Sequence, residues 1–165
     1  MQTLSKIMRG VAKLEKVIIG ICLAVATVVI MYGVLGRQVD FIKHPQWSEE
    51  AVRYLMIWIT FIGSGICFRR SSHYGIDVIR RIKSPAFQKF VSIFVIAACA
   101  IFAILLLVYG GKMTMFTFKT GQLTAALRWP IWLVYLSVPV GGALILIHLV
   151  EVFMSEVLGI YTIEE

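Results

Sequence analysis

The chain has 165 residues, 59% of them hydrophobic, and a formal net charge of +7. This length leaves room for one domain, and the linkers between its apolar stretches are too short to hold a soluble catalytic domain. The Lys and Arg residues gather in particular loops, which is typical of a membrane protein and argues against a nucleic-acid partner. All three cysteines lie inside apolar stretches, so we expect no disulfide framework.

The N-terminal residues 1–16 are predicted to form a basic amphipathic helix, with apolar side chains at helical spacing and cations on the other face. Such a helix is suited to lie in the interface of an anionic leaflet. The alternative is that it continues the first span into the cytosol. Residues 17–36 form that span, because about 20 apolar residues cross a bilayer. We expect it to remain uncut, since its apolar run continues well beyond Ala24-Val25-Ala26.

The second span is predicted at about residues 49–69. Ser48 is placed to cap it, and Glu49 and Glu50 fall in the first turn, where the helix dipole favours negative charge. Arg53 follows on the same helical face as Glu50, at a depth from which a long side chain can reach the surface.

The third and fourth spans are predicted at about residues 86–111 and 129–152. The third opens at Ser84-Pro85, a cap followed by a first-position proline. In the fourth, Pro139 followed by two glycines predicts a kink. The fold class that results is an all-α integral membrane protein with four transmembrane helices and an N-terminal amphipathic interfacial helix, in a single domain over 1–165.

The charge distribution sets the expected orientation. Most of the 16 Lys and Arg residues precede the first span or lie between the second and third, whereas the outer loops carry few. The positive-inside rule therefore places both termini in the cytoplasm.

The predicted spans carry little chemistry. Within their apolar stretches, residues 17–36, 54–68, 90–111 and 129–150, the only such titratable side chain is His148, expected as a hydrogen-bonded residue near the inner boundary. No Asp or Glu lies in these stretches to bind a cation. A transport pathway usually needs such groups. No metal-ligand cluster or catalytic set is recognisable. The chain alone is therefore expected to be neither an enzyme nor a self-sufficient pump, and to hold no cofactor or metal.

The residues around the second span resemble a known family. The resemblance is to the small permease subunit, of the DctQ type, of the tripartite ATP-independent periplasmic (TRAP) transporters. It is carried by Arg37, Trp47-Ser48-Glu49-Glu50, Tyr54-Leu55-Met56-Ile57-Trp58 and Arg69-Arg70-Ser71-Ser72-His73. The four spans and the basic loop after the second are similar as well, so the likeness extends over nearly the whole chain.

The resemblance implies a division of labour in the bacterial inner membrane. A periplasmic binding protein delivers an organic acid to a large permease subunit of the DctM or SiaM type, which holds the sodium and substrate sites and moves as an elevator. The small subunit is then a static scaffold. Nothing after Glu165 could form the large subunit, so we expect a separate polypeptide.

The substrate implied depends on the branch of the family. The overall pattern is closest to the sialic-acid branch, SiaQ, which implies import of N-acetylneuraminate. Two alternatives stay open, namely the small subunit of a C4-dicarboxylate TRAP transporter and a membrane assembly factor without a role in transport.

Candidate site residues follow from this reading, although each also fits a solvated charge or an anchoring aromatic. An ion pair between Arg37 and Glu50 is expected to join the first two spans. Candidates for joining helices or docking a partner are Arg37, Lys43, Trp47, Ser48, Glu49, Glu50, Arg53, Lys112 and Lys119. Candidate cytoplasmic-face anchors are Arg69, Arg70 and His73. Candidates for close packing, against the large subunit or the chain's own helices, are Gly20, Ala24 and Gly63. Membrane lipids are expected as a further partner of the chain.

Overall fold

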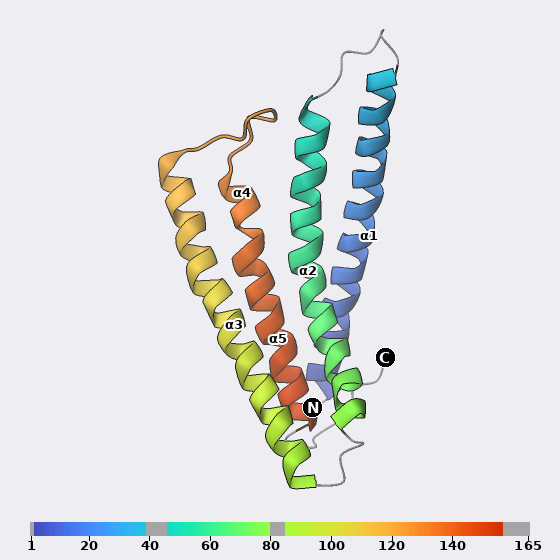
Figure 1. Ribbon diagram of the computed structural model, residues 1–165, viewed down its shortest axis with the longest axis vertical. Coiled ribbons are helices and arrows are strands. Elements are labelled where there is room, and N and C mark those ends of the chain that lie inside the picture. Colours follow the sequence, from blue (N-terminus) through green and yellow to red (C-terminus); the bar gives the residue numbers. More distant parts are fainter. Residues whose placement is uncertain (1, 39–45, 80–84, 157–165) are drawn as a thin grey trace.

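The computed structural model describes residues 2–38, 46–79 and 85–156, and these are almost entirely helical (Figure 1). The helices are α1 (Gln2–Gln38), α2 (Gln46–Ile79), α3 (Pro85–Thr120), α4 (Trp132–Tyr135) and α5 (Ser137–Glu156). Four segments are long and apolar enough to cross a membrane: Gly10–Arg37, Trp47–Phe68, Ile93–Thr120 and Trp132–Phe153. The prediction of an all-α protein with four membrane-spanning helices is confirmed.

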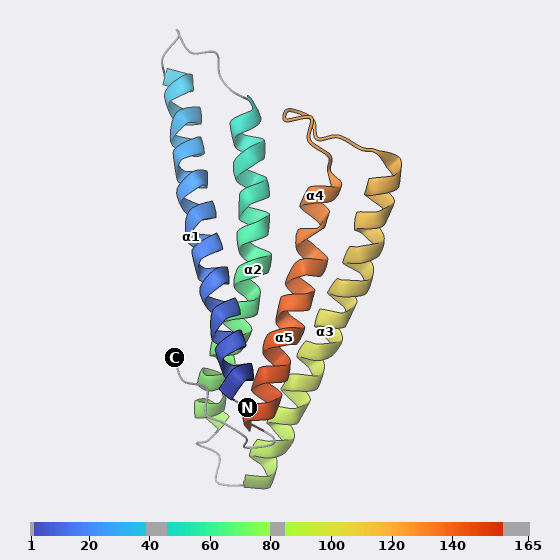
Figure 2. The ribbon, with the colours of Figure 1, turned by 180° about the vertical axis from the view of Figure 1, so that it is seen from behind.

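The helices form a row in the order α1, α2, α5, α3 instead of a closed bundle. The main packing contacts are α1 with α2, α2 with α5 and α5 with α3, and the two opposite views show the same order (Figures 1 and 2). The start of α1 and the end of α5 lie at the same end of the row, as four crossings require. Their placement in the cytoplasm stays a prediction.

Two adjacent glycines place α5 in the middle of the row. A Cβ on Gly141 would lie 2.9 Å from the Cβ of Phe61 in α2, whereas one on Gly142 would lie 3.0 Å from the carbonyl oxygen of Ala103 in α3. Both distances are shorter than an ordinary carbon contact of about 3.5–4.0 Å. Only glycine lets the backbone of α5 approach both neighbours this closely, which is how small residues pack membrane helices.

The edge helix α1 buries a single narrow stripe. Ala12, Ala26 and Gly33 are buried and recur at multiples of seven residues, and Glu15 and Gly36 are buried three residues after such positions. A seven-residue repeat of this kind is the seam of a coiled coil. The stripe faces α2, where a Cβ on Gly33 would lie 2.6 Å from the Ser48 hydroxyl oxygen.

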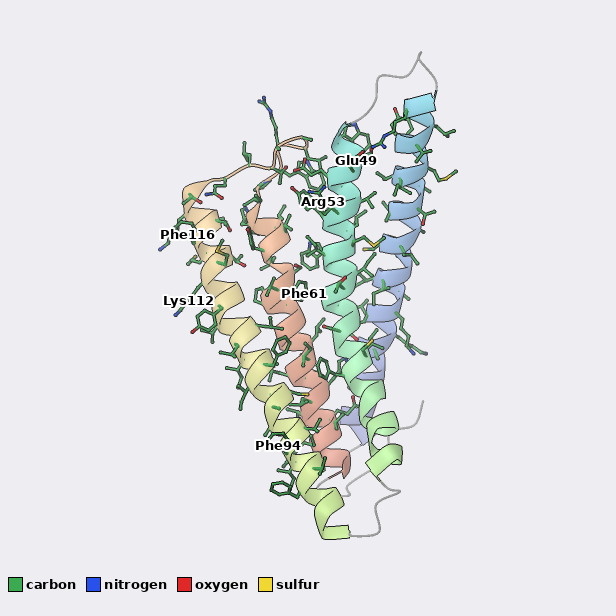
Figure 3. All side chains as sticks on the ribbon, viewed as in Figure 1. Glu49, Arg53, Phe61, Phe94, Lys112 and Phe116 are labelled. Carbon is green, nitrogen blue, oxygen red and sulfur yellow. The ribbon has the colours of Figure 1, made fainter. Side chains whose placement is uncertain are left out.

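The rest of each edge helix is exposed. Large apolar side chains cover the outside of α1, including Val28 at 69% exposure, and of α3, including Phe94 at 66%. In Figure 3 the labelled Phe94, Lys112 and Phe116 all point from α3 away from the other helices. Lipid or a partner protein must cover these edges, because such a surface is unstable in water.

The helix boundaries differ from the predicted ones in several places. Residues 2–16 are the continuous beginning of α1, so the alternative of an extended first span applies and not a separate interfacial helix. The helix α2 starts at Gln46, before Ser48, so Ser48 is not its cap but packs against α1.

The third span also continues past the glycines at which it was expected to end. Gly110 does not end α3 but allows a close approach, since its Cβ would lie 2.8 Å from a Val138 methyl group. Beyond it the helix runs to Thr120, and the hydroxyls of Thr114, Thr117 and Thr120 donate to carbonyls one turn back.

The fourth span is divided at Leu136, between α4 and α5, although Leu136 keeps helical dihedrals and its N–H donates to the Trp132 carbonyl at 2.9 Å. The kink expected around mid-membrane stays a prediction. Pro139 has no N–H to donate to the carbonyl four residues earlier, so the hydrogen-bond ladder is weakened at this turn. The Ser137 hydroxyl donates to the Val134 carbonyl at 2.7 Å at the same turn. The irregularity therefore lies one turn before the proline, near the loop end of the span.

Candidate functional site

The carboxylate of Glu50 holds the loop between α3 and α4 against α2. Its Oε1 accepts the backbone N–H of Ala125 at 3.2 Å, and its Oε2 accepts those of Ala126 and Leu127 at 2.7 and 2.8 Å. The Tyr54 hydroxyl donates to Oε1 at 2.5 Å from the next turn of α2. A carboxylate accepting several N–H groups makes charge-assisted bonds, which are about twice as strong as neutral ones. Glu50 is therefore a clamp between two distant parts of the chain.

The clamped loop is a small hairpin-like turn. The Thr124 N–H donates to the Trp129 carbonyl at 2.8 Å, and the Trp129 N–H donates to the Thr124 hydroxyl oxygen at 3.0 Å. Arg128 lies inside this turn with φ of +52°, a left-handed conformation that is unfavourable for a residue other than glycine. The hydrogen bonds on either side of Arg128 impose this conformation. The loop therefore stores backbone strain at a residue whose charged side chain is exposed.

A second contact joins α1 to α2 at the same end. The guanidinium of Arg37 forms an ion pair with the Glu49 carboxylate, which corrects the expected pairing with Glu50. The reason is geometric, because Glu50 faces the α3–α4 loop and Glu49, one residue earlier on α2, faces α1. Nearby, the rings of Trp47 and Tyr32 are tilted against each other at 6.1 Å between centroids.

The other basic candidates are dispersed. Arg53 is exposed on α2 below the loop (Figure 3). The Lys112 ammonium lies 5.6 Å from the centroid of the Tyr109 ring on the exposed side of α3, and Lys119 lies exposed in its last turn. Lys43 lies outside the described residues. The structure thus brings together Arg37, Trp47, Ser48, Glu49 and Glu50 but not these cations.

The candidate anchors at the other end are only partly described. Arg69, Arg70 and His73 lie within α2, which runs on to Ile79. Their side chains are outside the described part of the structure.

The glycine candidates lie on different faces. A Cβ on Gly63 would lie 3.7 Å from an Ile19 methyl group, an ordinary contact with α1. Gly20 would meet no atom within 4 Å, and Ala24 is exposed. In the described residues these two therefore do not pack the chain's own helices, and their surface is open to lipid or a partner.

A buried polar cluster at the end opposite the clamp was missed by the sequence reasoning. The expectation that His148 is hydrogen-bonded is confirmed: its Nε2 lies 3.0 Å from a carboxylate oxygen of Glu15, and its Nδ1 lies 3.7 Å from one of Glu151. All three side chains are at least 95% buried. Glu15 and Glu151 lie just outside the stretches in which no Asp or Glu was expected, residues 17–36 and 129–150, but both fall within the longer apolar segments Gly10–Arg37 and Trp132–Phe153.

A signal for this cluster exists in the sequence. Glu15 occupies a buried position in the seven-residue stripe of α1, and the stripe becomes visible once the amphipathic segment and the first span are treated as one helix. Among the residues that the structure describes, no group of three or more His, Cys, Asp or Glu side chains is arranged to hold a metal ion. The cluster is thus a polar cross-link between α1 and α5, and a Cβ added to Gly65 of α2 would lie 3.2 Å from its imidazole.

Comparison with known proteins places the chain in a family of transporter components. The family described as tripartite ATP-independent periplasmic transporters, DctQ component, matches residues 26–159, and the chain belongs to it. With its four spans it is a multi-pass protein of the inner membrane.

Several curated relatives carry the name C4-dicarboxylate TRAP transporter small permease protein DctQ. The chain is 28% identical to the one from Rhodobacter capsulatus, over 64% of this chain and 47% of the relative. It is 30% identical to that from Pseudomonas aeruginosa, over 66% and 53%, and 25% identical to that from Vibrio cholerae, over 58% and 40%. The chain thus spans about half the length of the curated relatives it matches. No solved structure matches it.

Proposed function

We propose that this chain is the static scaffold subunit of a sodium-driven TRAP transporter. In this proposal a periplasmic binding protein delivers an organic acid to a complex of this chain with a large permease subunit of the DctM or SiaM type. Sodium and substrate bind in the large subunit, and both termini of this chain lie in the cytoplasm.

The single observation that carries the proposal is the open row of helices. Each edge helix buries one stripe and exposes the rest of its apolar surface. The four helices therefore do not close into a bundle, and the exposed faces of the edge helices are available to a partner. An elevator slides one domain through the bilayer, and the body beside it must resist tilt and local thinning. A row held together by close glycine contacts is suited to that task.

The buried ionisable groups support a scaffold as well. Glu15, His148 and Glu151 join the first and last helices, and Glu50 holds a loop. These groups are committed to internal contacts, whereas a carrier of charged solutes needs groups that exchange partners along a path.

The loop that Glu50 clamps is the proposed docking element for the binding protein. It presents Leu123 and Trp129, each 59% exposed, on either side of the exposed Arg128. An exposed aromatic beside an arginine is the residue combination enriched at protein interfaces.

The proposed substrate is sialic acid, because the sequence pattern is closest to that branch of the family. The alternative substrate is a C4-dicarboxylate, the class given in the names of the relatives. Proteoliposomes with the large subunit and the binding protein, with and without this chain, test the proposal. A sodium gradient should drive uptake of one of the two acids only when this chain is present. Uptake at the full rate without it would overturn the scaffold role, and sodium-independent uptake would overturn the coupling.

A further inference from the structure

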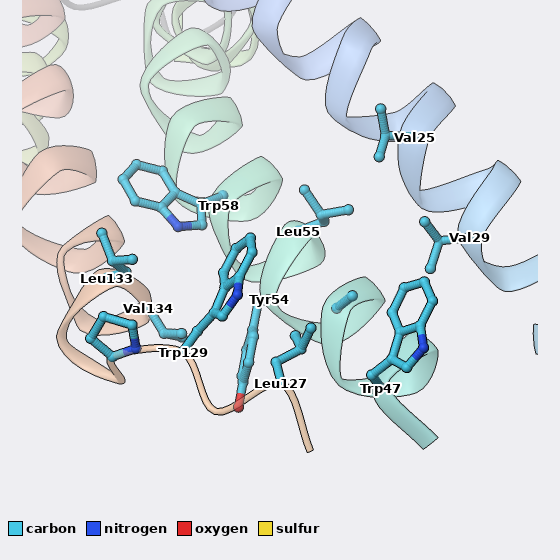
Figure 4. A pocket seen from close by; sticks show the side chains of 12 residues that line it. Val25, Val29, Trp47, Tyr54, Leu55, Trp58, Leu127, Trp129, Leu133 and Val134 are labelled. Atoms are coloured by element: carbon cyan, nitrogen blue, oxygen red, sulfur yellow. The ribbon is translucent and has the colours of Figure 1, made fainter. Parts of the chain in front are cut away.

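A cavity of about 460 Å³ opens in the row near the clamped loop (Figure 4). The side chains of Trp47, Tyr54 and Trp58 on α2 form its floor, Val25 and Val29 of α1 lie on one side, and Trp129 lies on the other. None of the residues lining it is charged. Its size falls in the range of small-molecule sites, about 300–1,000 Å³, and its surface suits a purely apolar occupant.

The depth of the cavity matches one leaflet of a bilayer. Trp47 and Trp58 lie about 16 Å apart along the axis of α2, at 1.5 Å per residue, which is half of the hydrocarbon thickness of about 30 Å. Beyond Trp58 the row closes, because Phe61 packs on Gly141 of α5 and Gly63 contacts Ile19 of α1. A membrane-spanning helix of a partner would need a groove across both leaflets, whereas a lipid tail needs only this half.

The loop end of the cavity has the polarity of a membrane interface. The indole and phenol rings of Trp47, Tyr54 and Trp129 place polar atoms among apolar ones, as in the aromatic belts of membrane proteins. Arg128 lies between the lining residues Leu127 and Trp129, and its side chain is exposed. An exposed cation that lies in the chain between two wall residues of an apolar cavity suits a molecule with an anionic head and a hydrocarbon tail.

We propose that the cavity binds one acyl chain of a phospholipid from the leaflet next to the α3–α4 loop, with the phosphate at Arg128. The Glu50 clamp keeps Leu127 and Trp129 in position as part of the wall. The bound lipid fills the space between α2 and α4 and stiffens the row where the chain's own side chains do not meet. This site does not depend on the proposed transport role, although it shares Arg128 and Trp129 with the loop proposed to dock the binding protein.

A photo-crosslinking phospholipid with a diazirine in its acyl chain tests the proposal. The full chain is placed in lipid nanodiscs, alone and with the large permease subunit, and labelled residues are mapped by mass spectrometry. Labelling is expected at the deep lining residues Leu55 and Trp58 in both preparations. Diacylglycerol carrying the same diazirine, which lacks the phosphate, should label them about fivefold less, the factor expected for one surface cation.

Two variants test the binding of the acyl chain and of the phosphate separately. Ala51→Phe fills the cavity from the floor and should abolish labelling of the deep residues, whereas Met56→Phe, at an exposed position on α2, should leave it unchanged. Arg128→Gly, which suits the positive φ, should lower phospholipid labelling to the diacylglycerol level.

Three results would overturn the proposal. Equal labelling by phospholipid and diacylglycerol would exclude a phosphate site at Arg128. Unchanged labelling in Ala51→Phe would place the lipid elsewhere. Loss of labelling only when the large subunit is present would mean that the partner protein occupies the cavity.

Discussion

Replacement of Gly141 by alanine is expected to force α5 away from α2. The added Cβ would lie 2.9 Å from both the Cβ and the carbonyl oxygen of Phe61, and carbon atoms in contact prefer about 3.5–4.0 Å. The helices must therefore separate by roughly 0.6–1 Å, which loses a quarter to a half of the attraction at each contact. Overpacking of this size costs about 1–3 kcal/mol, against which alanine's higher helix propensity contributes about 1 kcal/mol.

The variant Gly20→Ala is the matched control. Its Cβ would meet nothing within 4 Å, so only the propensity gain of about 1 kcal/mol applies. Because that gain is common to both variants, the difference between their free energies of unfolding isolates the steric cost of about 1–3 kcal/mol. Circular dichroism during titration of the micelle-bound chain with sodium dodecyl sulfate measures both values. Equal stabilities would refute the close contact between α2 and α5.

Other predictions concern the polar contacts. Glu50→Gln is expected to speed hydrogen–deuterium exchange at the three amides it accepts, because they lose a charged acceptor, while Glu49→Gln leaves them unchanged; equal rates in both variants would exclude the clamp. Arg128→Gly should raise the free energy of unfolding by about 1 kcal/mol through relief of the left-handed backbone, and a lower melting temperature would contradict this. Glu15→Ala should destabilise the chain by roughly 3–5 kcal/mol, because His148 loses its partner in a buried site. The same detergent titration measures that loss, and a change near zero would show that the contact is not structural.

The spans could be predicted from the sequence because a bilayer imposes length and polarity directly. About 20 apolar residues are needed wherever a helix crosses, and no knowledge of neighbours is required. The helix ends were harder to predict. Gly110 and Ser48 carry the signals of a helix end and a cap, but each is buried where another helix comes close. Tertiary contact, which a local pattern does not contain, decides between those roles.

The polar contacts, too, were predictable only where a local sequence pattern determines them. That Glu49 and Glu50 belong to the start of the second span follows from helix electrostatics. Which of them meets Arg37 depends on the rotation of α2 relative to α1, and the other binds a loop 75 to 77 residues further along the chain. The cluster of Glu15 with His148 spans 133 residues, and a reading that separates the N-terminal segment from the first span places Glu15 outside the membrane.

The separation of Glu15 and His148 in the sequence has a consequence for the order in which the helices are made. Glu15 leaves the ribosome well before His148 has been translated, so the newly inserted first helix carries a carboxylate whose imidazole has yet to be made. A carboxylate in lipid is costly, which favours a shallow early position of this helix with Glu15 among the head groups. We therefore expect the first helix to reach its final depth only after the last helix has been inserted and His148 can contact Glu15.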